Sequence, residues 1–367
     1  MNLANLIAIQ QWAISNRDVA LLDPLNFDKS IETVHAMNQN KDSRSLINFL
    51  YQHLPRPDVL DTYDYDTALA AMRDLGIFIG SLKRHGIEPV EVMPELEYVL
   101  LVLMVKTDLP PRDTLLHYTV WNPSGERIRS YTGLPDEISL IESVKMALPS
   151  LMEAIVQLDL MHDSELHGDD FEDNCRLLKM KMEGMVRGIV NAKRNVSPGV
   201  FANELRFYFD PIKVDYNKEY VGPGAVEMPM FVFDHLLWSS DCDDSTYTTF
   251  KEGYLPYNIA LVRDIYKKYK GRPSLISKIE STLKTKGFVR NYRAAKAVLD
   301  LCNVLKSFRM PHKKVAEEAY KHGEDHHRKK GSGGYSVSIL DHIMNLQNEK
   351  LASLQAATSM FKINELV

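Results

Sequence analysis

Apolar residues recur at steps of three and four along most of this chain, a spacing that puts them on one face of an α-helix. Period-two alternation, which is typical of strands, is scarce. The sequence therefore predicts an all-α fold in which most stripes are core. The clearest stripes are Met72, Leu75, Ile79, Leu82; Ile141, Val144, Leu148, Leu151, Ile155, Leu158; Leu178, Met182, Met185, Ile189; Val226, Met230, Phe233, Leu237; and Ala294, Val298, Leu301, Leu305, Phe308.

Two polar stretches interrupt the helical pattern. Asn122–Gly133 contains Pro, Gly and several charges, and we expect a domain junction there. This predicts a smaller helical domain over 1–127 and a larger one over 128–367. The second stretch, Lys321–Gly334, is as long as structureless loops usually become inside compact domains, so we expect a lid, a binding loop or a disordered segment.

Composition excludes several classes of protein. Lys plus Arg is 44 and Asp plus Glu is 49, a net charge of −5, so we expect no nucleic-acid partner. The longest apolar run, Tyr98–Val105, is far short of the ~20 residues of a membrane helix, and the N-terminus is a poor signal peptide. Cys175, Cys242 and Cys302 are far apart, which predicts reduced thiols in the cytoplasm and excludes the C-x-x-C attachment of a c-type haem.

The familiar nucleotide-binding, hydrolase and EF-hand motifs are absent. The acidic run of Asp241, Asp243 and Asp244 precedes an expected helix near Ser245, where carboxylates cap the first turn. His322, His326 and His327 lie in a charged segment, and we interpret them as solvated rather than as a metal site. Any chemistry must therefore come from less obvious residues.

His312 ends an apolar stripe, because it follows Leu301, Leu305 and Phe308 at steps of four, three and four. Pro311 is expected to kink or break the helix at this point. A buried imidazole needs a partner, since an unpaired polar group in a core costs ~1–3 kcal/mol. That partner is either a nearby carbonyl or a metal, and haem iron fits a site with one protein imidazole. The spacing alone leaves both alternatives open, and a core histidine is the commoner case.

Arg206 lies on the flank of another predicted helix, which Ser197 begins as N-cap and Pro198 as first residue. Its guanidinium could bind a carboxylate in bidentate fashion, or it could form a surface ion pair with Glu204 or Asp210. Gly331-Ser332-Gly333-Gly334 is similarly ambiguous. Its glycines allow close approach to a ligand or an anion-binding nest, and they equally suit a flexible linker.

These features occur in an order that resembles a known haem superfamily. FRMPH at 308–312 followed by GSGG at 331–334 resembles the haem-histidine and glycine-loop region of indoleamine 2,3-dioxygenases, and VFANELR at 200–206 resembles their distal helix. The similarity is closer still to the monodechloroaminopyrrolnitrin synthase family of that superfamily. It covers nearly the whole chain through GSLKRHG at 80–86, LLHYTVWNP at 115–123, SYTGLPDE at 130–137, GPGAVEMP at 222–229 and GSGGY at 331–335.

The resemblance implies an all-helical, two-domain indoleamine 2,3-dioxygenase-like fold with a non-covalent haem b. By the same resemblance His312 is the proximal ligand of the haem iron, and Phe201 and Arg206 lie on the distal side. Tyr320 and Ser332 match residues near the indole substrate and join Arg206 as the expected catalytic residues. Ala202 departs from the dioxygenase pattern, where Phe is usual. The remaining expected substrate- or cofactor-binding positions are Ala225, Gly331, Gly333 and Gly334.

The implied activity is oxidation of the indole ring of tryptophan, or of a substituted tryptophan, with dioxygen. Two products fit this class: N-formylkynurenine by dioxygenation, or an aminophenylpyrrole by rearrangement and decarboxylation. Alternatives outside the class are a haem-binding or sensing protein without turnover and a haem-free helical scaffold. The expected partners are the tryptophan-like molecule and dioxygen, without nucleic acid or membrane, and homo-oligomer formation is left open.

Overall fold

The computed structural model describes residues 3–166, 169–285, 288–323, 335–336 and 338–364. It is 75% helical, and its described part contains one antiparallel pair of short strands, in which Ile212 pairs with Tyr220 and Val214 with Lys218. The expected all-α fold is confirmed. Within the described residues, every helix is too short or too polar to cross a lipid bilayer.

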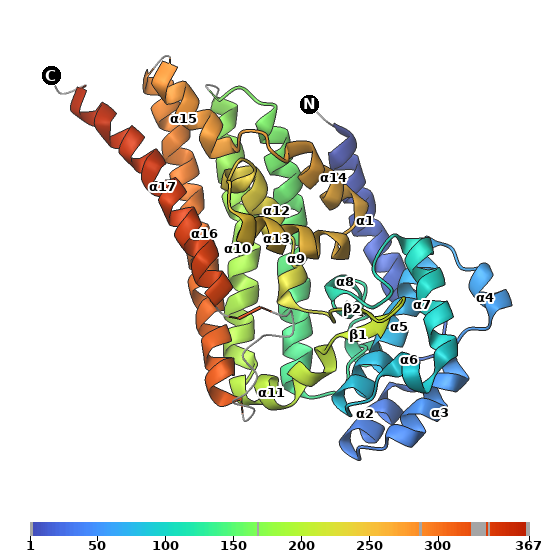
Figure 1. Ribbon diagram of the computed structural model, residues 1–367. Coiled ribbons are helices and arrows are strands. Elements are labelled where there is room, and N and C mark those ends of the chain that lie inside the picture. The colour runs from blue at the N-terminus through green and yellow to red at the C-terminus, as the bar shows by residue number, and fades with distance from the viewer. Residues whose placement is uncertain (1–2, 167–168, 286–287, 324–334, 337, 365–367) are drawn as a thin grey trace.

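Helices follow one another along the whole chain (Figure 1). The first part contains α1 (Leu3–Leu21), α2 (Ile31–Gln39), α3 (Ser43–His53), α4 (Pro57–Asp61), α5 (Tyr65–Arg84), α6 (Pro89–Val92), α7 (Pro94–Thr107), α8 (Leu115–Tyr118) and the 3-10 turn η1 (Gly125–Arg127). The second part contains α9 (Pro135–His162), α10 (Asp169–Asn195), α11 (Pro198–Asn203), the 3-10 turn η2 (Leu205–Phe209), β1 (Ile212–Val214), β2 (Lys218–Tyr220), the 3-10 turn η3 (Ala225–Glu227), α12 (Met230–Asp234), the π-helical turn η4 (His235–Ser239), α13 (Ser245–Tyr254), the 3-10 turn η5 (Leu255–Tyr257), α14 (Ala260–Tyr269), α15 (Leu275–Thr285), α16 (Phe288–His322) and α17 (Ser338–Asn364).

Three long helices form the centre of the larger part of the molecule. Figure 1 shows α9, α10 and α16 side by side, with α17 along α16 and α11 across one end of the group. Their facing stripes are buried as predicted, including Leu151 and Ile155 on α9 and Met182 on α10. In this layer α16 packs against α10 on one side and α17 on another.

The smaller part of the molecule is built around α5. Asp64 caps this helix by accepting a hydrogen bond from the Thr67 backbone N–H at 2.8 Å, and nearly the whole helix after its first turn is buried. A second hydrophobic cluster surrounds α5 and includes side chains from late in the chain, among them Leu205 and Ile212. The η2 turn and the hairpin therefore pack against the N-terminal helices.

The polar stretch Asn122–Gly133 is non-helical apart from η1, as its composition indicates, but it is not a loose linker. Arg129 is fully buried there and donates hydrogen bonds to Asp74 at 2.9 Å and Asp23 at 3.0 Å. The Asn122 amide donates to two backbone carbonyls. The division into domains at 1–127 and 128–367 stays a prediction.

Gly80 on α5 provides a test of the packing in the smaller cluster. A Cβ at this position would lie 2.5 Å from the Tyr131 ring, which is fully buried and stacked on Tyr208 at 4.4 Å between centroids. We expect Gly80→Ala to lower the free energy of unfolding by ~1–3 kcal/mol, measured by urea titration. The matched control is Gly253→Ala on α13, where the new Cβ meets no atom within 4 Å. That variant should gain ~0.5–1 kcal/mol, and a loss of equal size in both variants would contradict this account.

Candidate functional site

His312 lies on α16, which continues through Pro311 without ending there. The stripe that precedes it is buried, and the ring of His312 stacks on Phe308 with centroids 5.6 Å apart and planes 17° from parallel. His312 itself is half-buried, and so is Val315 one turn further on. The helix thus presents an imidazole at the border between packed core and a less covered face.

The His312 imidazole makes no hydrogen bond within the part of the chain that the structure describes. Burial, with a smaller contribution from the positive charge of Arg309, lowers its pKa to about 4. The ring is therefore neutral at physiological pH and keeps a nitrogen lone pair. The sequence analysis left two partners open for this imidazole, a backbone carbonyl and a metal. No carbonyl of the described residues accepts a hydrogen bond from it.

Arg309, one turn before His312, anchors this section of α16 to two other helices. Its guanidinium forms a buried ion pair with Asp234 of α12 and donates to the side-chain oxygen of Gln347 of α17. Asp234 also accepts hydrogen bonds from Trp238 at 2.9 Å and Tyr247 at 2.7 Å. These contacts fix the rotation of α16 and with it the direction in which His312 points.

The segment that contains Phe201 and Arg206 packs against the end of α16. Ser197 and Pro198 begin α11 as predicted, with the Ser197 hydroxyl accepting from the Val200 backbone N–H. The helix is shorter than expected, because it ends at Asn203 and the 3-10 turn η2 follows. Asn203 donates to the His322 carbonyl at 3.0 Å, which joins α11 to the last turn of α16.

Arg206 is buried, with 5% of its surface exposed, so it is not the surface arginine that its spacing also allowed. Its guanidinium lies over the ring of Tyr320, 4.6 Å from the centroid. The Tyr320 hydroxyl is buried and has no hydrogen-bond partner among the described residues. Glu204, one of the predicted partners of Arg206, forms an ion pair with Arg84 at 2.7 Å. The structure thus brings Arg206 and Tyr320 together on one side of α16.

The remaining predicted residues are less informative. Phe201 is half-buried beside the buried Ala202, and Ala225 is exposed at the start of η3. Gly331, Ser332, Gly333 and Gly334 lie outside the described residues, as does most of the stretch that we expected to form a lid. Asp244 caps α13 as predicted, accepting from the Tyr247 backbone N–H at 2.6 Å.

The sequence model of monodechloroaminopyrrolnitrin synthase PrnB matches residues 23–366. The chain belongs to this family. The family is part of the superfamily of indoleamine and tryptophan 2,3-dioxygenases, so the predicted family and fold are both confirmed. Its members are haem-dependent oxidoreductases that act on substrates derived from tryptophan.

The residues around His312 fit a haem group. Within the described residues no cluster of three or more His, Cys, Asp or Glu could hold a metal ion, and a haem iron needs only one protein imidazole. His312 supplies a neutral imidazole to which no described residue forms a competing hydrogen bond. Beside it, Val315 and Ala316 offer small, half-covered apolar surface. A single imidazole at an apolar face is the donor set that haem uses.

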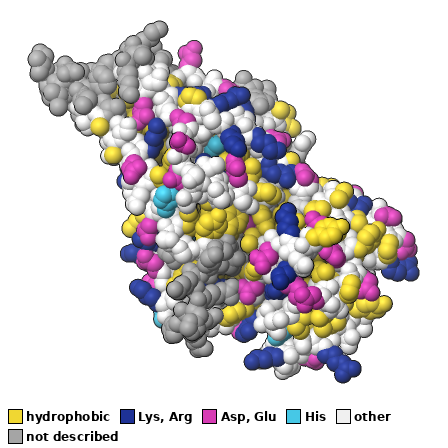
Figure 2. Space-filling model, viewed as in Figure 1, with side chains coloured by type: hydrophobic (Ala, Val, Ile, Leu, Met, Phe, Trp, Pro, Cys, Tyr) yellow, Lys and Arg dark blue, Asp and Glu magenta, His cyan; other side chains and the backbone are white. Residues whose placement is uncertain are grey.

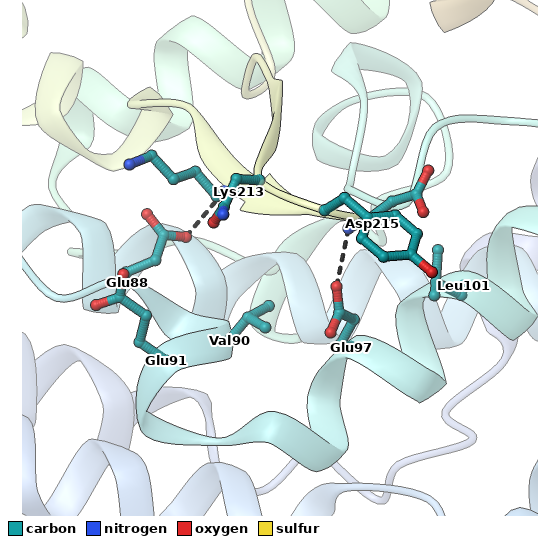
Figure 3. Close-up of a pocket in the computed structure, with 9 residues that line it drawn as sticks. Glu88, Val90, Glu91, Glu97, Leu101, Lys213 and Asp215 are labelled. Carbon is teal, nitrogen blue, oxygen red and sulfur yellow. Dashed lines mark hydrogen bonds between the residues drawn. The ribbon is translucent and has the colours of Figure 1, made fainter.

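Two cavities lie away from His312. One, of about 560 Å³, separates the hairpin from α6 and α7 (Figure 3). There Glu88 and Glu97 accept hydrogen bonds from the backbone N–H groups of Lys213 and Asp215, at 2.9 and 2.8 Å. These carboxylates accept hydrogen bonds from the backbone N–H groups on the outer edge of the hairpin. We therefore assign them a role in stabilising the fold rather than in binding a ligand.

The other cavity, of about 340 Å³, lies beside η4, α13 and α14. Lys251 is buried at its wall and donates to the Ser239 carbonyl at 3.0 Å. Burial lowers the pKa of Lys251 to about 8 and that of the neighbouring His235 to about 3. The lining of this cavity includes Asp241 and Asp243 of the acidic run, which the sequence analysis interpreted as helix-capping residues, and no cavity was predicted there.

The buried pair between Arg309 and Asp234 allows a test of how α16 is held. We expect Asp234→Asn to lower the free energy of unfolding of the haem-free protein by ~3–5 kcal/mol, because it leaves a buried guanidinium without a counter-charge. Chemical denaturation measures this change. The control is Asp58→Asn, since Asp58 pairs with Arg56 on the surface and both side chains are more than half exposed. Equal effects of the two substitutions would contradict the anchoring role.

Proposed function

We propose that this protein holds a non-covalent haem b through His312 and uses it to oxidise the indole ring of tryptophan, or of a substituted tryptophan, with dioxygen. The observation that carries this proposal is the packing of α11 and η2 on the end of α16. It gathers Phe201, Arg206, Tyr320 and His312 on two adjoining segments. When bound, haem supplies the redox-active iron that reacts with dioxygen.

The protein would contribute orientation and exclusion of water. His312 would hold the iron with a neutral imidazole, and Arg309 would keep the helix beneath it in one rotation through its pair with Asp234. Arg206 would bind the carboxylate of the substrate, because a guanidinium in a buried position attracts a carboxylate far more strongly than one in water. The Tyr320 hydroxyl, which has no hydrogen-bond partner among the described residues, belongs to the ring that Arg206 covers and could donate to the same ligand.

Two products remain within this proposal, N-formylkynurenine and an aminophenylpyrrole. Ala202 is buried where the dioxygenases usually have Phe, so the side chain next to Phe201 is smaller than in the dioxygenase pattern. Family membership and this substitution together favour the pyrrole-forming rearrangement. Ser332 and its neighbouring glycines are proposed as substrate- or cofactor-binding residues on the resemblance alone.

His312→Ala should abolish or greatly weaken haem binding. The measurement is the haem content and visible spectrum of protein purified from cells supplied with a haem precursor. The control is His322→Ala, an exposed histidine at the end of the same helix, which should bind haem as the wild type does. Circular dichroism checks that both variants fold. An unchanged spectrum of His312→Ala would refute the assignment of the ligand.

Arg206→Ala should weaken tryptophan binding by ~2–5 kcal/mol, because it removes a buried charge partner of the carboxylate. Arg206→Lys should recover only part of this loss, since lysine keeps the charge but not the two-pronged geometry. Titrations of the haem spectrum with tryptophan and with tryptamine, which lacks the carboxylate, measure the effect.

The wild type should prefer tryptophan, and Arg206→Ala should lose most of that preference while retaining haem. Arg84→Ala is the control, because Arg84 is a neighbouring arginine whose partner is Glu204. If Arg206→Ala discriminates between the two ligands as well as the wild type does, another group holds the carboxylate.

A further inference from the structure

Apolar side chains reach the surface at several places, as Figure 2 shows for one face of the molecule. Among the described residues, α1 contributes three large ones: Ile7, Ile14 and Leu21, which are 52%, 59% and 69% exposed. They are spaced by seven residues, so they lie in one row along the helix. A row of this kind is unlike the scattered apolar residues that every protein surface carries.

The opposite face of α1 is already fixed to the body of the protein. Ile9 and Val19 are buried, and the side-chain oxygen Oδ1 of Asn16 accepts a hydrogen bond from the Trp121 indole N–H at 2.7 Å. Asn5 donates to Asp159 at 2.7 Å and Ser15 to Asp66 at 2.9 Å. Because these bonds hold α1 in one rotation, the row of Ile7, Ile14 and Leu21 cannot turn inward.

Four exposed polar residues border the row: Gln10, Gln11, Arg17 and Asp18. None of them makes a hydrogen bond or ion pair within the residues that the structure describes. If two copies of α1 pack antiparallel about a two-fold axis at Ile14, position 7 meets 21, and residues on the same flank of the row face each other, so that position 10 meets 17 and position 11 meets 18. Each charged side chain then meets a glutamine amide, whose N–H can donate to Asp18 and whose oxygen can accept from Arg17.

We infer that the exposed face of α1 is a two-fold interface with a second copy of this chain. In this arrangement the apolar residues of one copy face those of the other, and each charged border residue faces a glutamine. A symmetric interface requires such a match of one surface with itself. From Ile7 to Leu21 the row spans about 21 Å at 1.5 Å per residue. One helix pair of this length buries less than the ~1,200–2,000 Å² of stable interfaces, so the dimer is reversible and depends on concentration.

This interface is independent of the proposed haem chemistry. Figure 1 shows α1 on the outer side of the molecule, away from α11 and α16. It also precedes the residues 23–366 that match the family. An experiment that refutes the dimer would therefore leave the proposed function intact, and one that refutes the proposed function would leave the dimer intact.

The test is sedimentation velocity of the full chain over a micromolar concentration series. The weight-average mass of the wild type should rise from one chain toward two. Ile14→Glu and Ile14→Lys should each stay monomeric, because position 14 meets itself across the axis and like charges repel. An equal mixture of the two variants should associate at least as strongly as the wild type.

Val105→Glu is the matched control, since Val105 is 77% exposed on α7 and should not affect association. Wild type that stays monomeric throughout, or Ile14→Glu that associates like the wild type, would overturn the inference.

Disulfide trapping tests the antiparallel arrangement. The background is Cys242→Ser, because Cys242 is partly exposed and Cys175 and Cys302 are buried. Ile14→Cys should form a covalent dimer under mild oxidation. Ile7→Cys should do so only when mixed with Leu21→Cys. Crosslinking of Ile7→Cys alone, with no mixed dimer of Ile7→Cys and Leu21→Cys in the mixture, would show a parallel pair and contradict the proposed interface.

Discussion

The buried ion pair between Arg309 and Asp234 is the interaction on which the candidate site depends. Buried ion pairs contribute little net stability unless other hydrogen bonds satisfy the charged groups. Here Tyr247 and Trp238 donate to Asp234, and Gln347 accepts from Arg309, so both charges are well satisfied. Through these contacts Arg309 holds α16, α12 and α17 in one relative position. The pair therefore matters less for net stability than for the orientation of the helical turn that carries His312.

Sequence periodicity predicted the framework around this pair but not the pair itself. The stripes of α5, α9, α10 and α16 are buried as expected, because apolar spacing reports directly on which helix face is covered. Arg309 and Asp234 are 75 residues apart, and a single charged residue has no period that could connect it with its partner. The burial of Arg206 escaped prediction for the same reason, since Tyr320 approaches it only through the packing of α11 on α16.

The segment after Arg206 departs most from the helical prediction, and its stability comes from tertiary contacts. The buried Arg112 donates to the backbone carbonyls of Tyr208, Asp210 and Tyr220, which are left without helical partners there. Pro211 is the local signal that could have indicated the change, because proline disfavours helix in the residue before it. The hairpin itself is short and its outer edge depends on Glu88 and Glu97, so no strand pattern marks it in the sequence.

The two buried arginines near α16 lie in different surroundings: one forms an ion pair with a buried carboxylate, and the other lies over a tyrosine ring. Arg309 is compensated within the protein by the carboxylate of Asp234, so a second carboxylate there would compete with a bonded partner. Arg206 lies against the face of Tyr320, and such cation–π contacts contribute only ~0.5–2 kcal/mol. The Tyr320 hydroxyl beside this contact is buried and has no hydrogen-bond partner among the described residues, so it could donate a hydrogen bond to a polar ligand there. The ion pair with Asp234 therefore gives Arg309 the role of holding the turn that carries His312, while recognition of an amino acid stays a proposal for Arg206.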